Sequence, residues 1–103
     1  MRQSKYRAVR TKVGSVSFAS KKEAKRYGEL LLLKKAGLIA DLKLQPVIHC
    51  DLNGVHVCDY RADFFYTEKG QPVYEDCKGF RTPIYKLKVK LVRALTRIEI
   101  RET

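Results

Sequence analysis

The residues best suited to do chemistry are two aspartates and a lysine in the second half of the 103-residue chain, Asp63, Asp76 and Lys78. Side chains alternate between the two faces of a strand, so Asp76 and Lys78 would share one face while Glu75 and Cys77 would occupy the other. An aspartate and a lysine on one face can form a simple surface ion pair, or they can act together on a substrate. The position of Asp63 bears on this choice.

A predicted hairpin brings Asp63 close to the other two residues. If the turn that follows Tyr66 pairs it with Val73, antiparallel counting places Asp63 directly opposite Asp76. Cross-strand neighbours of this kind have Cβ atoms about 4.5 to 5.5 Å apart. Asp59 would share the face of Asp63, but it would lie about 13 Å away at roughly 3.3 Å per residue, too far to join the same site.

Two opposed carboxylates favour a bound cation. They repel each other unless a cation lies between them, and hard divalent ions take oxygen ligands together with water and substrate phosphate. We therefore expect Mg²⁺ or Mn²⁺ at Asp63 and Asp76. Such an ion can polarise a phosphodiester and help to generate a hydroxide, while Lys78 orients the attacking water or offsets charge in the transition state. The chemistry expected is phosphodiester hydrolysis.

A helix that begins near Glu23 is predicted before these strands. Ser20-Lys21-Lys22-Glu23 has the form of a capping box, and good helix formers follow as far as Gly37, a typical C-cap residue. Glu23 could reach the metal cluster, or it could simply complete the capping box. At about 100° per residue, Glu23 falls within the apolar stripe of the helix, which comprises Ala24, Tyr27, Leu30, Leu31 and Leu38.

The remaining elements complete one predicted domain. Asn53-Gly54 predicts a type I′ turn, and Thr82-Pro83 predicts the start of a second helix that reaches about Arg97. The order helix, strand, strand, strand, helix, strand predicts an α/β or α+β fold over residues 14–103. The strands are expected over 44–50, 55–66, 73–78 and 98–101.

The charge of the chain favours nucleic acid as a partner. Lys and Arg total 22 against 11 acidic residues, which gives a net charge of +11 and suits a polyanion. Residues 1–13 form a predicted basic arm, in which Arg7 and Arg10 could contact DNA or remain solvated. One face of the second helix is predicted to be apolar, with Ile84, Leu87, Leu91, Leu95 and Ile98. Another face carries the predicted DNA contacts Lys86, Lys90, Arg93 and Arg97.

The cysteines and the hydropathy indicate a reduced setting away from the membrane. The three cysteines, Cys50, Cys58 and Cys77, include no CxxC pair, which argues against a disulfide framework or a zinc knuckle. The longest aliphatic run, 30–33, is too short for a membrane span or a signal peptide. We therefore expect a cytoplasmic protein.

The order of elements and the spacing of the three residues resemble the PD-(D/E)XK nuclease superfamily. Asp63 matches its first acidic position, Asp76-Cys77-Lys78 matches the (D/E)-x-K element, and Ala62 stands in place of the proline. Glu23 matches the extra helical glutamate of phage endonuclease I type junction resolvases and of the TnsA transposase subunit. Nearly the whole chain also resembles small phage and prophage proteins with the patterns Ser-Lys-Lys-Glu-Ala, Leu-Gln-Pro, Ala-Asp-Phe and Glu-Asp-x-Lys-Gly.

This resemblance implies a restriction-endonuclease-like core and an Mg²⁺- or Mn²⁺-dependent DNA endonuclease, with Glu23 joining Asp63 and Asp76 as a metal ligand. A branched substrate such as a Holliday junction, a role in phage recombination or replication, and a homodimer that makes paired cuts are also implied. The host would be a bacterium. The main alternative is a catalytically silent DNA-binding or transposase-accessory module, since fold similarity alone does not prove catalysis. A ribosomal-type RNA-binding protein would explain the charge but not the opposed aspartates.

Overall fold

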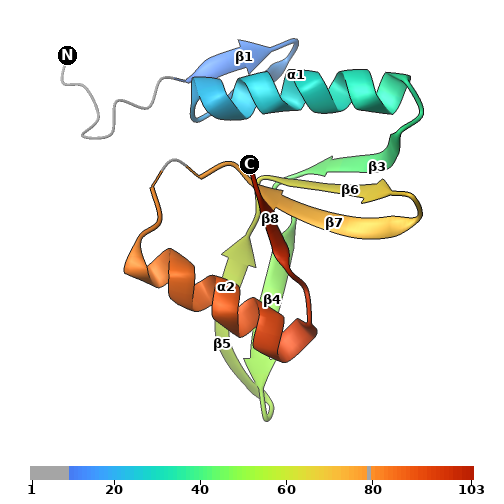
Figure 1. Ribbon diagram of the computed structural model, residues 1–103. Coiled ribbons are helices and arrows are strands. Elements are labelled where there is room, and N and C mark those ends of the chain that lie inside the picture. The colour runs from blue at the N-terminus through green and yellow to red at the C-terminus, as the bar shows by residue number, and fades with distance from the viewer. Residues whose placement is uncertain (1–9, 79) are drawn as a thin grey trace, which may run out of the picture. The chain divides into compact units, whose positions relative to one another are not determined.

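The computed structural model describes residues 10–78 and 80–103, which form a mixed α+β fold of two helices and eight strands (Figure 1). The predicted fold class is therefore confirmed at the level of α+β. The chain divides into two compact units, residues 1–38 and 39–103. Arg7, one of the predicted DNA contacts, lies outside the described residues. Neither of the helices described is long and apolar enough to cross a membrane.

The first unit contains a short hairpin and a helix. β1 (Thr11–Val13) pairs antiparallel with β2 (Val16–Phe18), and α1 (Lys21–Lys35) follows. The hairpin was not predicted, and the last three residues assigned to the basic arm belong to β1. Its turn contains Gly14, whose φ of 61° suits glycine. The ring centroid of buried Phe18 lies 4.9 Å from that of Tyr27, which fixes the hairpin against the helix.

Both predicted ends of α1 are confirmed. The Ser20 hydroxyl accepts a hydrogen bond from the Glu23 backbone N–H at 3.2 Å, and Gly37 follows the helix with a φ of 77°. The predicted apolar stripe is only partly buried. Ala24 and Leu30 are buried, whereas Leu31 is 36% and Leu38 61% exposed.

The second unit contains a four-stranded sheet and a separate hairpin. The sheet has the order β3-β6-β7-β8, in which β8 is parallel to β7 and the other pairs are antiparallel. Its strands are β3 (Ile39–Leu44), β6 (Phe64–Glu68), β7 (Gln71–Asp76) and β8 (Ile100–Glu102). β4 (Val47–Leu52) and β5 (Val55–Arg61) form the hairpin, which extends away from the sheet in Figure 1.

The strands predicted over 44–50 and 55–66 are both interrupted, and the two breaks lie opposite each other. Pro46 has no N–H to donate, and Gln45 before it adopts a φ of 50°, so the first strand turns there. The second strand breaks opposite, at Ala62 and Asp63. The Gln45 N–H donates to the Asp63 carbonyl at 2.9 Å, and the Ala62 N–H donates to the Pro46 carbonyl at 3.0 Å. The two strands therefore stay paired through the bend that separates the hairpin from the sheet.

The predicted turn and register are both present. Asn53 and Gly54 have φ values of 51° and 78°, as a type I′ turn requires. The turn expected after Tyr66 is a tight one at residues 69–70, between the paired residues Glu68 and Gln71. Tyr66 pairs with Val73, as predicted.

The second helix, α2 (Pro83–Thr96), lies across the β4-β5 hairpin (Figure 1). Thr82 caps it by accepting the Tyr85 N–H at 3.0 Å. The predicted apolar face was partly wrong, because Ile84 is 67% and Leu87 58% exposed. The helix instead buries an adjacent arc that the sequence analysis left out, with Val92 fully buried and Tyr85 and Val89 partly buried. The core that α2 covers comprises Ile48, Cys50, Tyr60, Ala62 and Val92.

Candidate active site

The bend in the long hairpin places Asp63 beside the end of β7. The Asp63 N–H lies 3.0 Å from the Glu75 carbonyl and 3.1 Å from Oδ1 of Asp76, and both oxygens accept from it. In return, the Cys77 N–H donates to Oδ2 of Asp63 at 2.7 Å. The Asp76 side chain is thus held by the backbone of Asp63, and the Asp63 side chain by the backbone of Cys77, the residue after Asp76. The structure brings the two predicted carboxylates together.

Asp76 is a buried carboxylate with an unsatisfied oxygen. Its exposed fraction is 0%, and its Oδ2 has no hydrogen-bond partner among the residues that the structure describes. Burial raises the pKa of Asp76 to about 6, against the opposing effect of Lys78. Burial also raises the pKa of Asp63, although the Cys77 N–H acts in the other direction. A buried acceptor without a partner is costly, so this pair of carboxylates is suited to a bound cation.

Lys78 is held near Asp76 by the ring of Tyr85 on α2, which Glu102 of β8 supports in turn. Its Nζ lies 4.0 Å from Oδ1 of Asp76 and 4.8 Å from the centroid of the Tyr85 ring. The Tyr85 hydroxyl donates to Glu102 at 2.8 Å, and Arg81 forms an ion pair with Glu102 at 2.9 Å. The ammonium group therefore rests between a carboxylate and the face of an aromatic ring, a cation–π arrangement.

Sequence reasoning missed the supporting group formed by Tyr85, Glu102 and Arg81. Glu102 is paired with Asp76 through the parallel register of β7 and β8. Because α2 connects these strands, no turn in the sequence fixes their register. The one available signal was the position of Tyr85 one helical turn before Val89, on the face that the structure buries.

The structure separates Glu75 and Asp59 from this site, in agreement with the strand geometry. Glu75 is fully buried, where it accepts hydrogen bonds from the Tyr66 hydroxyl at 2.6 Å and from the Thr103 hydroxyl at 3.0 Å. Asp59 lies on the exposed part of β5, where its Oδ1 is 2.7 Å from Nδ1 of His49. Glu23 belongs to the first unit, and its catalytic role stays a prediction.

A basic pocket adjoins Lys78 in the second unit. It has a volume of about 450 Å³ and lies between β5 and the first turns of α2. Lys88 lines it, with Nζ donating to the Asp59 carbonyl at 3.1 Å. The pocket can admit a phosphate group next to Lys78, since its polar lining holds the three cations Arg61, Lys78 and Lys88 against one carboxylate, Asp59, together with the hydroxyls of Thr82 and Tyr85.

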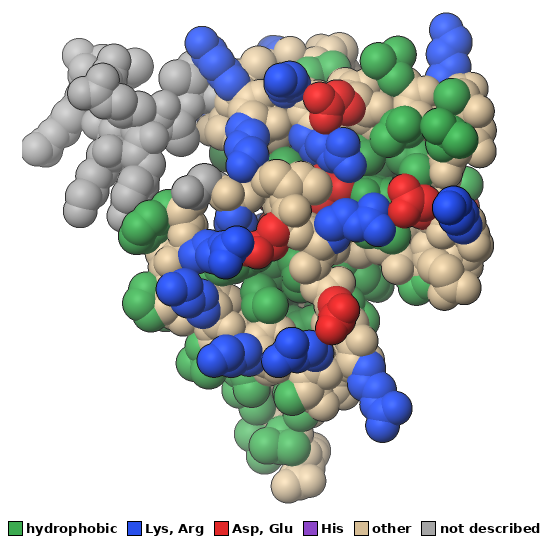
Figure 2. Space-filling model, in the orientation of Figure 1, with side chains coloured by type: hydrophobic (Ala, Val, Ile, Leu, Met, Phe, Trp, Pro, Cys, Tyr) green, Lys and Arg blue, Asp and Glu red, His purple; other side chains and the backbone are tan. Residues whose placement is uncertain are grey.

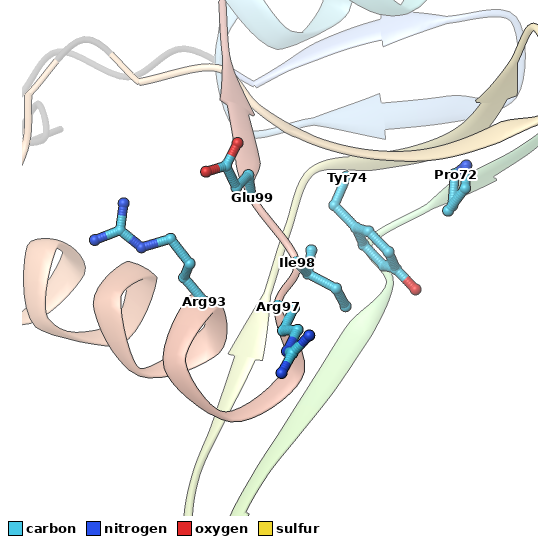
Figure 3. Close-up of a pocket in the computed structure, with 6 residues that line it drawn as sticks. All are labelled: Pro72, Tyr74, Arg93, Arg97, Ile98 and Glu99. Carbon is cyan, nitrogen blue, oxygen red and sulfur yellow. The ribbon is translucent and has the colours of Figure 1, made fainter.

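The predicted basic face of α2 is exposed. Figure 2 shows basic side chains gathered along α2 on the face in view. Arg93 and Arg97 project from the C-terminal part of the helix and line a second pocket of about 520 Å³ together with Tyr74 of β7 (Figure 3). Arg10 of the first unit is also exposed. The four predicted contacts on this face, all exposed, are Lys86, Lys90, Arg93 and Arg97.

Comparison with known proteins identifies the family but not its activity. The model of one family, described as a protein of unknown function (DUF1064), matches residues 3–102. No curated protein and no solved structure matches the chain. Because the family model spans nearly the whole sequence, the chain belongs to the DUF1064 family.

Proposed function

We propose that this protein is a metal-dependent endonuclease that hydrolyses phosphodiester bonds of DNA at a site formed by Asp63, Asp76 and Lys78. One observation carries the proposal. Asp76 is buried with a carboxylate oxygen that has no partner among the described residues, directly beside a second carboxylate and a lysine, in a chain with a net charge of +11. A plain surface ion pair would leave both carboxylate oxygens accessible to water.

The side chains present fit Mg²⁺ or Mn²⁺. Both candidate ligands are carboxylates, the oxygen donors that these ions prefer. Asp63 and Oδ2 of Asp76 would hold the ion, since Oδ1 of Asp76 and Oδ2 of Asp63 already accept backbone N–H groups. When bound, the ion supplies Lewis-acid activation of the phosphate and of water.

Lys78 would stabilise the charge that develops on the phosphate. Its distance of 4.0 Å from Asp76 is longer than a close hydrogen bond, so the ammonium group can also meet an incoming anion. The Tyr85 ring on its other side limits how far it can move. The basic pocket with Arg61 and Lys88 would receive the phosphates next to the one that is cut.

The exposed basic face of α2 would bind more distant phosphates of the same DNA. These contacts carry no sequence information, which is compatible with a substrate chosen by shape. Together with the resemblance to junction resolvases, this favours branched DNA. We also propose a homodimer, because resolution of a junction requires two paired cuts.

The test is a cleavage assay on supercoiled plasmid, linear duplex and a four-way junction with Mg²⁺ or Mn²⁺. We expect the wild type to cut the junction, and Asp76→Ala and Lys78→Ala to lose cutting. Asp41→Asn and Lys43→Met, two exposed positions of the same unit, serve as matched controls and should cut normally. The proposal fails if none of the substrates is cut, or if the Asp76 and Lys78 variants cut as well as the wild type. DNA binding without cutting would indicate the silent module instead.

A further inference from the structure

We propose that the exposed face of the β4-β5 hairpin binds a transition-metal ion of the Zn²⁺ class through His49, His56 and Asp59. One ligand atom from each of these residues lies within 4.8 Å of the other two. Nδ1 of His49 is 2.7 Å and Nε2 of His56 is 3.1 Å from the same oxygen, Oδ1 of Asp59. This site is separate from the pair Asp63 and Asp76, and it does not depend on the proposed nuclease activity.

A β-bulge brings His56 to this face. His49 pairs with Asp59 across the hairpin, and the register shifts after Cys50 so that Asp51 pairs with His56 rather than with Val57. Regular alternation would place His56 on the opposite face from Asp59. The bulge re-aims the side chain, so two imidazoles and a carboxylate from both strands meet on the solvent side.

Asp51 adds the outer contact that metal-binding histidines ordinarily have. Its Oδ1 lies 2.7 Å from Nδ1 of His56, while Nε2 of the same ring faces Asp59. A carboxylate that accepts Nδ1–H fixes the tautomer in which Nε2 carries the lone pair for a metal. The ring is therefore oriented as it would be in a carboxylate–histidine–metal group.

The donor set selects the class of ion. Imidazole nitrogens suit Zn²⁺, Cu²⁺ and Ni²⁺, whereas Mg²⁺ prefers sites made only of oxygen. Two histidines and one aspartate occupy three positions and leave at least one for water or another ligand. The thiols of Cys50 and Cys58 lie on the other face of the hairpin, in contact with the core under α2.

His56 contacts two carboxylates through its two ring nitrogens, Asp51 through Nδ1 at 2.7 Å and Asp59 through Nε2 at 3.1 Å. The protonated ring can donate to both. The hydrogen bond to Asp51 raises the pKa of His56 accordingly. Lys88 is the cation that approaches from α2, but its contact is with the Asp59 carbonyl rather than the carboxylate. A metal ion held by His49, His56 and Asp59 would cross-link β4 to β5.

Zn²⁺ itself is the probe for the test, titrated into the full chain by calorimetry and by ¹⁵N NMR of the imidazoles. The sequence contains only two histidines, so both ring signals belong to the site. We expect one equivalent to bind with a shift of both rings, and any further equivalent, as at Asp63 and Asp76, to leave the rings unshifted. His49→Gln and His56→Gln should lose binding, and Asp51→Asn should weaken it about tenfold or more through loss of the outer contact. The three ligand side chains are more than half exposed, so these variants should keep the fold, which circular dichroism checks.

Two control variants separate this site from other metal-binding groups. Cys58→Ser and Asp76→Asn, the second of which removes the proposed nuclease site, should both show the wild-type ring shifts when Zn²⁺ is added. The inference is overturned if the wild type shows no saturable binding, if the His→Gln variants bind unchanged, or if Cys58→Ser loses binding. A failure to cleave DNA, without any of these results, would not contradict the proposed metal site at His49, His56 and Asp59.

Discussion

Among single residues, Asp76 shows the clearest conflict between function and stability, because a metal ligand must be ionised and burial disfavours its ionised form. Burial raises its pKa from 3.8 to about 6, so the folded state binds this proton more tightly than the unfolded state. The free energy of unfolding contributed by this group should therefore fall as the pH rises from about 4 to about 6, and the loss should be complete above that range. A metal ion would offset this cost by supplying the missing partner.

Asp76→Asn should accordingly stabilise the metal-free protein at neutral and alkaline pH. A pKa raised by about two units corresponds to an upper bound of about 3 kcal/mol, and we expect a gain of about 1–2 kcal/mol, because the variant also loses the attraction to Lys78. Below pH 4 the gain should disappear. Urea unfolding in the presence of EDTA at both ends of this range measures the difference. An equal effect at both pH values would show that the ionised form is not destabilised by burial.

Tyr85 is expected to act as a positioning residue for Lys78. Tyr85→Phe keeps the ring under the ammonium group and loses only the hydrogen bond to Glu102. Tyr85→Leu removes the ring, whose cation–π contact is worth about 0.5–2 kcal/mol. We expect Phe to retain kcat within about twofold and Leu to lower it by about three- to tenfold. Equal losses in the two variants would assign the effect to the hydroxyl instead.

At the scale of elements, sequence patterns predicted what depends on local spacing. Both helix starts, the Asn53-Gly54 turn and the pairing of Tyr66 with Val73 follow from caps, turn residues and antiparallel counting. The bend at Pro46 was not predicted, because the alternation of apolar residues continues through it. The parallel pairing that brings Glu102 to Asp76 depends on how α2 packs, which no local signal encodes.

The two faces of α2 also show that local sequence signals do not reveal how a helix packs. The basic stripe was predicted as it is seen, because charged side chains remain in solvent wherever the helix packs. The apolar arc on α2 is wider than the surface it covers, so spacing alone did not show that Ile84 and Leu87 would be exposed and Tyr85 and Val92 packed. Only the partner surface on β4 and β5 decides this.

Charge removal from α2 should weaken DNA binding in a salt-dependent way. If Arg93 and Arg97 each contact a phosphate, the double Gln variant should lower the slope of log K against log salt concentration by about 1.8, at roughly 0.9 for each contact. Lys69→Asn, a charge change at a turn where φ is 52° and Asn is well tolerated, is the matched control. Fluorescence anisotropy over a salt series measures the slope. An unchanged slope in the double variant would place the DNA on another surface.

At the scale of the whole molecule, the family membership extends over both units, whereas most of the basic excess belongs to the first, with 11 Lys and Arg against 2 acidic residues in 1–38 and 11 against 9 in 39–103. Glu23 is the predicted catalytic residue that belongs to the first unit. Glu23→Gln keeps the hydrogen bond from the backbone N–H of residue 23 to the Ser20 hydroxyl. Its glutamine side chain is also suited to a capping box. If Glu23 is catalytic, as the resemblance implies, this variant should lose DNA cleavage at least tenfold with stability within about 0.5 kcal/mol of the wild type. Ser20→Ala should show the reverse, a loss of about 1 kcal/mol with cleavage retained. Normal cleavage by Glu23→Gln would leave only the capping role.

Asp76 is proposed to serve catalysis rather than DNA affinity. The most direct measurement combines binding and single-turnover cleavage of one labelled four-way junction by wild-type protein and Asp76→Asn, with Mg²⁺ added to start the reaction. The wild type should cut only after Mg²⁺ is added. Asp76→Asn should bind as tightly or more tightly, because it removes a negative charge facing the phosphates, and it should not cut. Cleavage by Asp76→Asn at the wild-type rate, or no cleavage by the wild type when the junction is saturated with protein, would contradict the claim.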